Sequence, residues 1–138
     1  MPELDDAMMA RALELAREAA GMGEVPVGAV VWETDSGRVL GEGFNRREID
    51  SDPSAHAEFL AIQRACAAVG DWRLNHCSLA VTPEPCPMCA GLILNARVGR
   101  VVYGPDDPNA GARPTLVAPT TAHRLHHPPQ PTPGVRAP

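Results

Sequence analysis

Apolar residues three or four positions apart predict a helix over residues 3–20. One stripe of this helix is formed by Met9, Leu13, Ala16 and Ala20. Acidic residues gather at the start of the segment, where the helix dipole favours negative charge. Gly21 and Gly23 follow the apolar stripe and predict the end of the helix.

The next two segments, residues 25–33 and 37–45, are rich in residues that favour β-strands. The short stretch between them consists of turn-forming residues, Thr34, Asp35 and Ser36. The pair of segments therefore predicts a β-hairpin.

Helical and strand patterns alternate through the middle of the chain. A helix is expected over residues 52–70, with Ser54 as its N-cap and Gly70 at its end. This assignment places His56 in the first turn. The patterns that follow predict a strand at 77–82, a helix at 85–96 and a strand at 99–104. Such alternation predicts an α/β domain with a mixed or parallel sheet covered by helices.

The character of the chain changes after Gly104. Nine of the fifteen prolines lie in residues 105–138, and this segment shows neither helical nor strand periodicity. It lacks the apolar side chains that offset the entropy of ordering. We therefore expect one domain over residues 1–112, followed by a flexible proline-rich tail over residues 113–138.

The composition agrees with a single globular domain, because 138 residues with 44% hydrophobic content suffice for an apolar core. We recognise no charged leader with an apolar stretch behind it, and no uncharged apolar run of about 18 residues. We therefore expect neither export nor membrane insertion, and a cytoplasmic location. In that reducing compartment, cysteines are expected to be metal ligands, reactive groups or small buried side chains rather than disulfides.

The formal net charge is −5, and the chain contains no lysine. Such a chain is poorly suited to non-specific phosphate binding, which relies on clustered basic residues. A nucleic-acid substrate would have to be met by local arginines. The candidates are Arg46, Arg47, Arg97 and Arg100. Contact with phosphate and ordinary solvated charge are equally good interpretations of these four residues.

The stretch PEPCPMCAGLIL, residues 83–94, carries two cysteines at the start of the helix predicted there. Pro87 fits the first helical position, where its missing N–H costs nothing and its φ angle is already helical. This makes Cys86 the N-cap and Cys89 the third helical residue. Both sulfurs then lie where the helix dipole and free N–H groups favour thiolates, the form that binds metal.

Two thiolates leave a zinc site incomplete, and the third ligand indicated by the sequence is His56. A structural zinc site would show a second CxxC motif or paired histidines, and neither occurs at the usual spacing. Three protein ligands leave the fourth position for water, which is typical of catalytic zinc. The other cysteines, Cys66 and Cys77, are interpreted as small buried side chains.

Glu58 follows His56 by two residues in the first turn of the helix. A carboxylate beside the metal can take a proton from water and hand one to a leaving amine. The simpler alternative is an acid favoured by the helix dipole. Together with the three ligands, Glu58 predicts hydrolytic deamination.

The order HxE followed by PCxxC is the signature of zinc deaminases that act on nucleobases. Further blocks resemble the bacterial tRNA-specific adenosine deaminases, the TadA family, in that family's order. They are EVPVGAVV (24–31), GFNR (43–46), DPSAHAE (52–58), VTPEPCPMCAG (81–91) and GRVVYGPDDPNAGA (99–112).

This resemblance implies a cytidine-deaminase-like three-layer α/β sandwich with a mixed sheet flanked by helices. It also implies a homodimer, one zinc ion per chain, and conversion of adenosine to inosine at the wobble position in the anticodon arm of a tRNA. His56, Cys86 and Cys89 would hold the zinc, and Glu58 would move protons.

The resemblance also implies substrate contacts. Asn45 would bond the flipped base, although it is equally interpreted as a turn residue at the end of a strand. Val27 and Ala57 would form the pocket wall and backbone contacts, and Asp107 would approach the substrate backbone.

The chain departs from the family in its C-terminal part. A short helix, a fifth strand and a C-terminal helix are usual there, and we expect the proline-rich tail to replace them. The loss of a strand would leave an exposed sheet edge. The tail histidines, His123, His126 and His127, are interpreted as solvated rather than as metal ligands.

Two other functions stay open on the sequence alone. One is deamination of a free nucleobase or nucleoside, such as guanine or cytosine. The other is an inactive zinc-holding subunit that only dimerises with an active partner.

Overall fold

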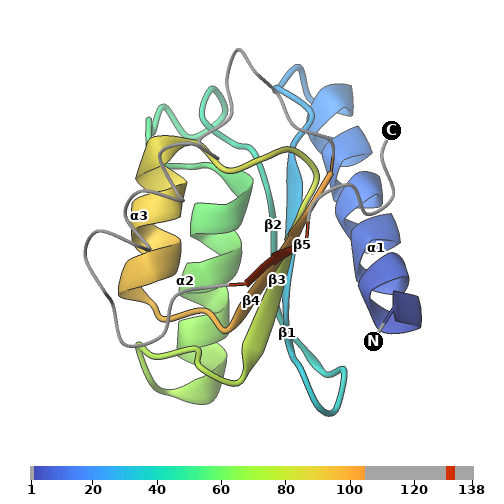
Figure 1. The fold of residues 1–138 in the computed structure, drawn as a ribbon. Coiled ribbons are helices and arrows are strands. Elements are labelled where there is room, and N and C mark those ends of the chain that lie inside the picture. Colours follow the sequence, from blue (N-terminus) through green and yellow to red (C-terminus); the bar gives the residue numbers. More distant parts are fainter. Residues whose placement is uncertain (1, 105–129, 133–138) are drawn as a thin grey trace.

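The computed structural model describes residues 2–104 and 130–132 as a three-layer sandwich. One helix covers one face of a central sheet, and two helices lie side by side on the other face (Figure 1). In chain order the elements are α1 (Pro2–Gly21), β1 (Gly28–Glu33), β2 (Val39–Phe44), α2 (Ala57–Val69), β3 (Cys77–Val81), α3 (Pro87–Asn95), β4 (Arg100–Tyr103) and β5 (Gln130–Thr132). None of the described helices has the length and apolar composition needed to cross a membrane.

The sheet is mixed, with the strand order β2-β1-β3-β4-β5. Strand β1 runs antiparallel to both β2 and β3, whereas β3, β4 and β5 run parallel to one another. The predicted α/β sandwich with a mixed sheet is confirmed, as is the hairpin of β1 and β2.

The expected loss of the fifth strand is wrong. Residues Gln130–Thr132, inside the proline-rich segment, form β5 and pair with β4. The edge of β4 is therefore covered. Strand β5 ends the sheet, which is the position where a strand tolerates a proline such as Pro131. The remaining tail, and with it the expected domain boundary at residue 112, lies outside the described residues.

Strand β1 separates two apolar cores, because successive side chains of a strand point to opposite faces. Val30 and Trp32 pack toward α1, and Ala29 and Val31 pack toward α2 and α3. All four side chains are fully buried. Both faces of the sheet are covered by helices, which explains why β1 reads as a continuous apolar run.

Helix α2 begins two residues later than the expected N-cap, Ser54, predicts. Ser54 is not its N-cap, because Ser54 belongs to a turn that ends before the helix. Within this turn the N–H and the hydroxyl of Ser54 donate to Oδ1 of Asp52, at 2.8 and 2.7 Å. The N-cap is His56, with an extended backbone. The imidazole therefore projects from the end of the helix instead of lying along its side.

Close contact between backbones seats α2 on the hairpin. A Cβ atom added at Gly43 in β2 would lie 2.6 Å from the carbonyl oxygen of Ala57, the first residue of α2. Only glycine permits this approach without movement of the helix. The sheet thus fixes the helix end that carries His56 and Glu58.

Candidate metal centre and active site

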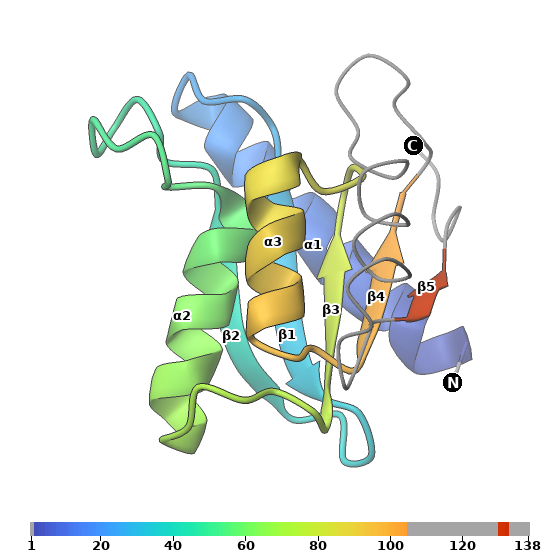
Figure 2. The ribbon, with the colours of Figure 1, turned by 60° about the vertical axis from the view of Figure 1, so that its left-hand side comes forward.

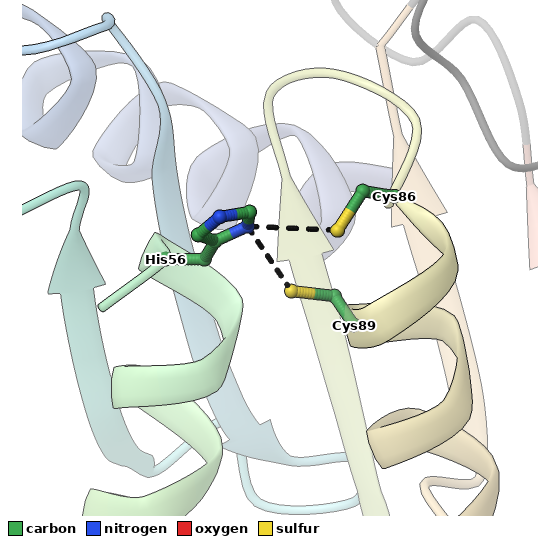
Figure 3. A group of neighbouring side chains, drawn as sticks. All are labelled: His56, Cys86 and Cys89. Carbon is green, nitrogen blue, oxygen red and sulfur yellow. Dashed lines mark hydrogen bonds between the residues drawn. The ribbon is translucent and has the colours of Figure 1, made fainter. Parts of the chain in front are cut away.

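Three side chains from distant parts of the sequence meet at one end of the molecule. Helices α2 and α3 lie side by side and begin at the same end of the sheet (Figure 2). Nδ1 of His56, at the start of α2, lies 3.5 Å from Sγ of Cys86 and 3.6 Å from Sγ of Cys89. Figure 3 shows the imidazole facing both sulfurs, which come from the start of α3.

Helix α3 begins at the residue that the sequence predicts. Pro87 is the first residue of α3, and Cys86 is its N-cap with an extended backbone. Cys89 lies one turn into the helix and is fully buried. The spacing of the CxxC motif therefore brings both sulfurs to the same side of the helix end, facing His56.

The three ligand atoms fit a tetrahedral zinc ion. Bond lengths of about 2.3 Å to sulfur and about 2.05 Å to nitrogen, at a tetrahedral angle, separate nitrogen from sulfur by about 3.6 Å. The two distances from His56 to the sulfurs match this value, and all three atoms lie within 4.8 Å of one another. Two thiolates and one imidazole are also ligand types that zinc prefers.

Burial influences the protonation of two of the ligands, His56 and Cys89. It lowers the pKa of His56, and the charge of Arg47 lowers it further, so the imidazole is neutral, as a metal ligand must be. Burial raises the pKa of the Cys89 thiol, and the neighbouring Glu58 and Cys86 raise it further. The helix start alone therefore does not produce a thiolate at Cys89. A cation bound by these residues would stabilise the thiolate form.

Glu58 lies directly against this group. It is 3% exposed, lies in the first turn of α2, and is close enough to the Cys89 thiol for each group to influence the pKa of the other. Burial raises the pKa of its carboxyl group. The structure thus places a carboxyl group beside the three ligands, where the sequence predicts a residue that moves protons.

A cavity of about 280 Å³ opens onto this group. Its lining includes all of the predicted substrate-contact residues that the structure describes, namely Val27, Asn45 and Ala57, together with His56, Glu58 and Cys86. Asp107 lies outside the described residues. The lining residues that sequence reasoning did not single out for this site are Val25, Pro26, Pro83 and Glu84.

Asn45 lines the cavity and also stabilises the loop that follows β2. Its Oδ1 accepts a hydrogen bond from the Arg47 N–H at 3.0 Å, and its own N–H donates to Val27 O at 3.1 Å. The expected turn role is therefore confirmed. Base recognition by the same residue stays a prediction.

The four candidate arginines have different surroundings. Arg100 pairs with the buried Asp5 at 2.7 Å, Arg46 pairs with Asp50 at 3.0 Å, and Arg97 stacks on Trp72 at 5.1 Å. Arg47 lines the cavity, and its guanidinium has no ion-pair partner within residues 2–104. It is the candidate best placed to meet a phosphate.

Cys66 and Cys77 are remote from the metal group. Cys77 is buried in β3, and burial raises the pKa of its thiol to about 11. Cys66 is partly buried, and its thiol donates to Trp72 O at 3.7 Å. The prediction of a small buried side chain is therefore confirmed for Cys77, whereas Cys66 is only partly buried.

Comparison with known proteins decides the family. Residues 2–105 match the model of the cytidine and deoxycytidylate deaminase zinc-binding region. The chain belongs to this deaminase family. The His56, Cys86 and Cys89 group is accordingly the zinc site typical of the family.

The chain is similar to proteins named as tRNA deaminases and to a guanine deaminase. It is 46% identical to a tRNA-specific adenosine deaminase of Haemophilus influenzae over 80% of the chain. It is also similar to a structure from studies of A-to-I editing by tRNA:A34 deaminases at the wobble position, with 41% identity and a TM-score of 0.84 over 93% of this chain and 91% of that one. A guanine deaminase of Bacillus subtilis has 40% identity and a TM-score of 0.69 over 72% of this chain and 63% of that one.

The deaminase spans only part of several curated relatives. It covers 63% of the Haemophilus influenzae protein. It also matches the tRNA(Ile)-lysidine synthases of Deinococcus deserti and Deinococcus radiodurans, of which it covers 25% and 18%.

Proposed function

We propose that this deaminase converts adenosine to inosine at the wobble position of a tRNA, using one zinc ion per chain. The observation that carries the proposal is the grouping of His56, Cys86 and Cys89 next to a cavity whose lining includes His56, Glu58 and Cys86. The similarity to the tRNA:A34 deaminase structure, which extends over 93% of the chain, supports this substrate.

The chain's own residues have separate roles in the proposed reaction. When bound, zinc acts as a Lewis acid that activates water for attack on the base. Glu58 takes a proton from the attacking water and delivers a proton to the departing amine. One water is consumed and one ammonia is released for each adenosine. The burial of Glu58 excludes bulk water from this transfer.

The cavity walls are proposed to hold the flipped base. Val27 and Ala57 line the cavity. Ala57 is the first residue of α2, so its backbone N–H has no acceptor within the helix. Asn45 would bond the base edge from the opposite loop. Asp107 would contact the substrate backbone, and Arg47 at the cavity would meet a phosphate.

A second candidate function is deamination of a free base such as guanine. The likeness to the guanine deaminase of Bacillus subtilis favours it. The acidic composition agrees with this alternative, because it disfavours broad contact with phosphates.

The two functions are separated by a substrate comparison. Zinc-loaded protein is incubated with an arginine tRNA transcript that carries an ACG anticodon, and separately with adenosine, guanine and cytosine. A transcript with guanosine at the wobble position is the matched control. The proposal predicts inosine at the wobble base of the first transcript alone. Ammonia from a free base without inosine in the tRNA would establish the second candidate.

We further propose a cytoplasmic homodimer. A groove on the outer face of α2 and α3 is lined mainly by apolar side chains, among them Ile62, Leu92 and Trp72. Trp72 is 55% exposed, whereas tryptophan is highly buried on average. Sedimentation of the protein and of Trp72→Ser tests this proposal: a dimer that the substitution weakens supports it, and a monomeric parent protein contradicts it.

A further inference from the structure

Glu24 is a buried acid that the proposed chemistry does not use. Its side chain is 5% exposed, between the end of α1 and the start of β1. Its N–H donates to Ala19 O at 2.9 Å, which fixes it to the last turn of α1. A carboxylate in such a place requires partners, because burial of an unpaired charge is costly.

The partners are two consecutive backbone N–H groups in the loop after β2. Glu48 N donates to Oε1 at 3.2 Å, and Ile49 N donates to Oε2 at 2.7 Å. The Arg46 guanidinium, which is near enough to interact electrostatically with Glu24, is bonded to Asp50 instead. The charge of Glu24 is therefore met by main chain, in hydrogen bonds that the charge strengthens.

Both segments joined by this carboxylate line the cavity. Val25, Pro26 and Val27 follow Glu24 directly, and Asn45 and Arg47 lie just before the bonded N–H groups. The two walls have one further firm link, from the Asn45 N–H to Val27 O at 3.1 Å. The contact from Asn45 Nδ2 to Val25 O, at 3.5 Å, is long for a hydrogen bond.

The link is specific to a carboxylate. Two adjacent N–H groups require two acceptors at one side-chain end, which glutamate provides and glutamine does not. In glutamine the amide N–H group would face a backbone N–H group, and one buried donor would lose its acceptor. Aspartate keeps both acceptors on a shorter side chain.

We propose that Glu24 is a positioning residue that fixes the Asn45 and Arg47 loop against the Val25–Val27 wall and thereby sets how the substrate base is held. This inference rests on the proposed tRNA deamination and concerns the same site. The metal ligands and Glu58 lie on α2 and α3, which Glu24 does not contact through any hydrogen bond described here. Loss of the link should therefore weaken substrate binding more than the chemical step.

The test compares Glu24→Gln, Glu24→Asp and a control, Glu42→Gln. The Glu42 carboxylate also accepts two side-chain hydrogen bonds, from Arg11 at 2.8 and 3.0 Å, and the control substitution removes one of its acceptor oxygens. Glu42 lies on β2 and is not part of the cavity lining. Each protein is assayed for zinc content, for kcat and KM with the ACG-anticodon transcript, and for hydrogen exchange of the Glu48 and Ile49 amides.

For Glu24→Gln we expect a KM raised about tenfold or more, with kcat within about threefold of the parent and zinc unchanged. The two amides should exchange at least about tenfold faster. Glu24→Asp should lie between the parent and Glu24→Gln, and Glu42→Gln should change neither KM nor the two amides.

An unchanged KM in Glu24→Gln overturns the inference, as do Glu48 and Ile49 amides that exchange freely in the parent protein. The inference is also overturned if Glu24→Gln and Glu24→Asp lose zinc, kcat and folded protein to the same extent. That result would mean that Glu24 contributes only to folding. If the parent protein forms no inosine, the proposed function fails, and the amide exchange still decides whether Glu24 holds the loop.

Discussion

Nδ1 of His56 and Sγ of Cys86 lie 3.5 Å apart, although thirty residues separate them in the chain. The separation is that expected for two ligands of one tetrahedral zinc ion. Each residue is the N-cap of its helix, so neither has to distort the helix to reach the other. The packing of α2 and α3 on one face of the sheet creates the metal site.

Zinc binding should depend on Cys86 and Cys89 and not on the other cysteines. We expect Cys86→Ala and Cys89→Ala to lose stoichiometric zinc, whereas Cys66→Ala keeps it. Because zinc binds the folded chain, free zinc at 100 times its Kd adds about 2.7 kcal/mol to the free energy of unfolding. Metal analysis and thermal unfolding with and without a chelator measure both effects. Full zinc content in Cys89→Ala would exclude the assigned ligand set.

Gly43→Ala should disturb the site indirectly, because Gly43 in β2 packs against the start of α2. The added Cβ would meet Ala57 O at 2.6 Å and Leu60 Cβ at 3.0 Å, so the start of α2 must shift. We expect a loss of about 1–3 kcal/mol in the free energy of unfolding, together with reduced activity.

Gly91→Ala in α3 is the matched control, because an added Cβ there meets nothing within 4 Å. It should stabilise the helix by about 0.5–1 kcal/mol, since alanine has the higher helix propensity. Urea unfolding of both variants measures the difference. Equal effects at the two glycines would contradict the close packing of α2 on β2.

The Arg11–Glu42 pair should stabilise the protein only where Glu42 is ionised. The hydrogen bonds from Arg11 lower the pKa of Glu42 below its usual value. The contribution is therefore complete above the unfolded-state pKa of about 4.3, and is lost as the pH falls through the lower folded-state value. Both side chains are about one-third exposed, so solvent limits the effect to about 1 kcal/mol or less.

Urea unfolding of the parent protein and of Glu42→Gln, at pH 7 and near pH 3, tests this pair. The parent should be the more stable of the two at pH 7, and the difference should shrink at the lower pH. A difference that grows on acidification would show that the sign is wrong.

The sequence predicted the metal centre well because its signals are local. Pro87 fixes the start of α3, and this alone places Cys86 and Cys89. The error at Ser54 also has a local origin, since Asp52 accepts hydrogen bonds from Ser54 in a turn, and α2 begins only after this turn.

Other features depend on contacts between distant segments, which leave no pattern in a single sequence. Arg100 was a candidate for phosphate binding, but its partner Asp5 lies 95 residues away in α1. Strand β5 is three residues long and contains a proline, so no strand pattern marks it. The role of Glu24 becomes visible only when the loop after β2 is placed beside it.

In the proposed reaction, zinc at His56, Cys86 and Cys89 works with Glu58 to deaminate tRNA. The most direct measurement is zinc content and wobble inosine in the same preparations of the parent protein and of Glu58→Gln. We predict one zinc per chain in both, and inosine formation slowed by about 10²-fold or more in the variant. If Glu58→Gln carries full zinc and forms inosine at the parent rate, Glu58 is not the group that moves protons in this reaction.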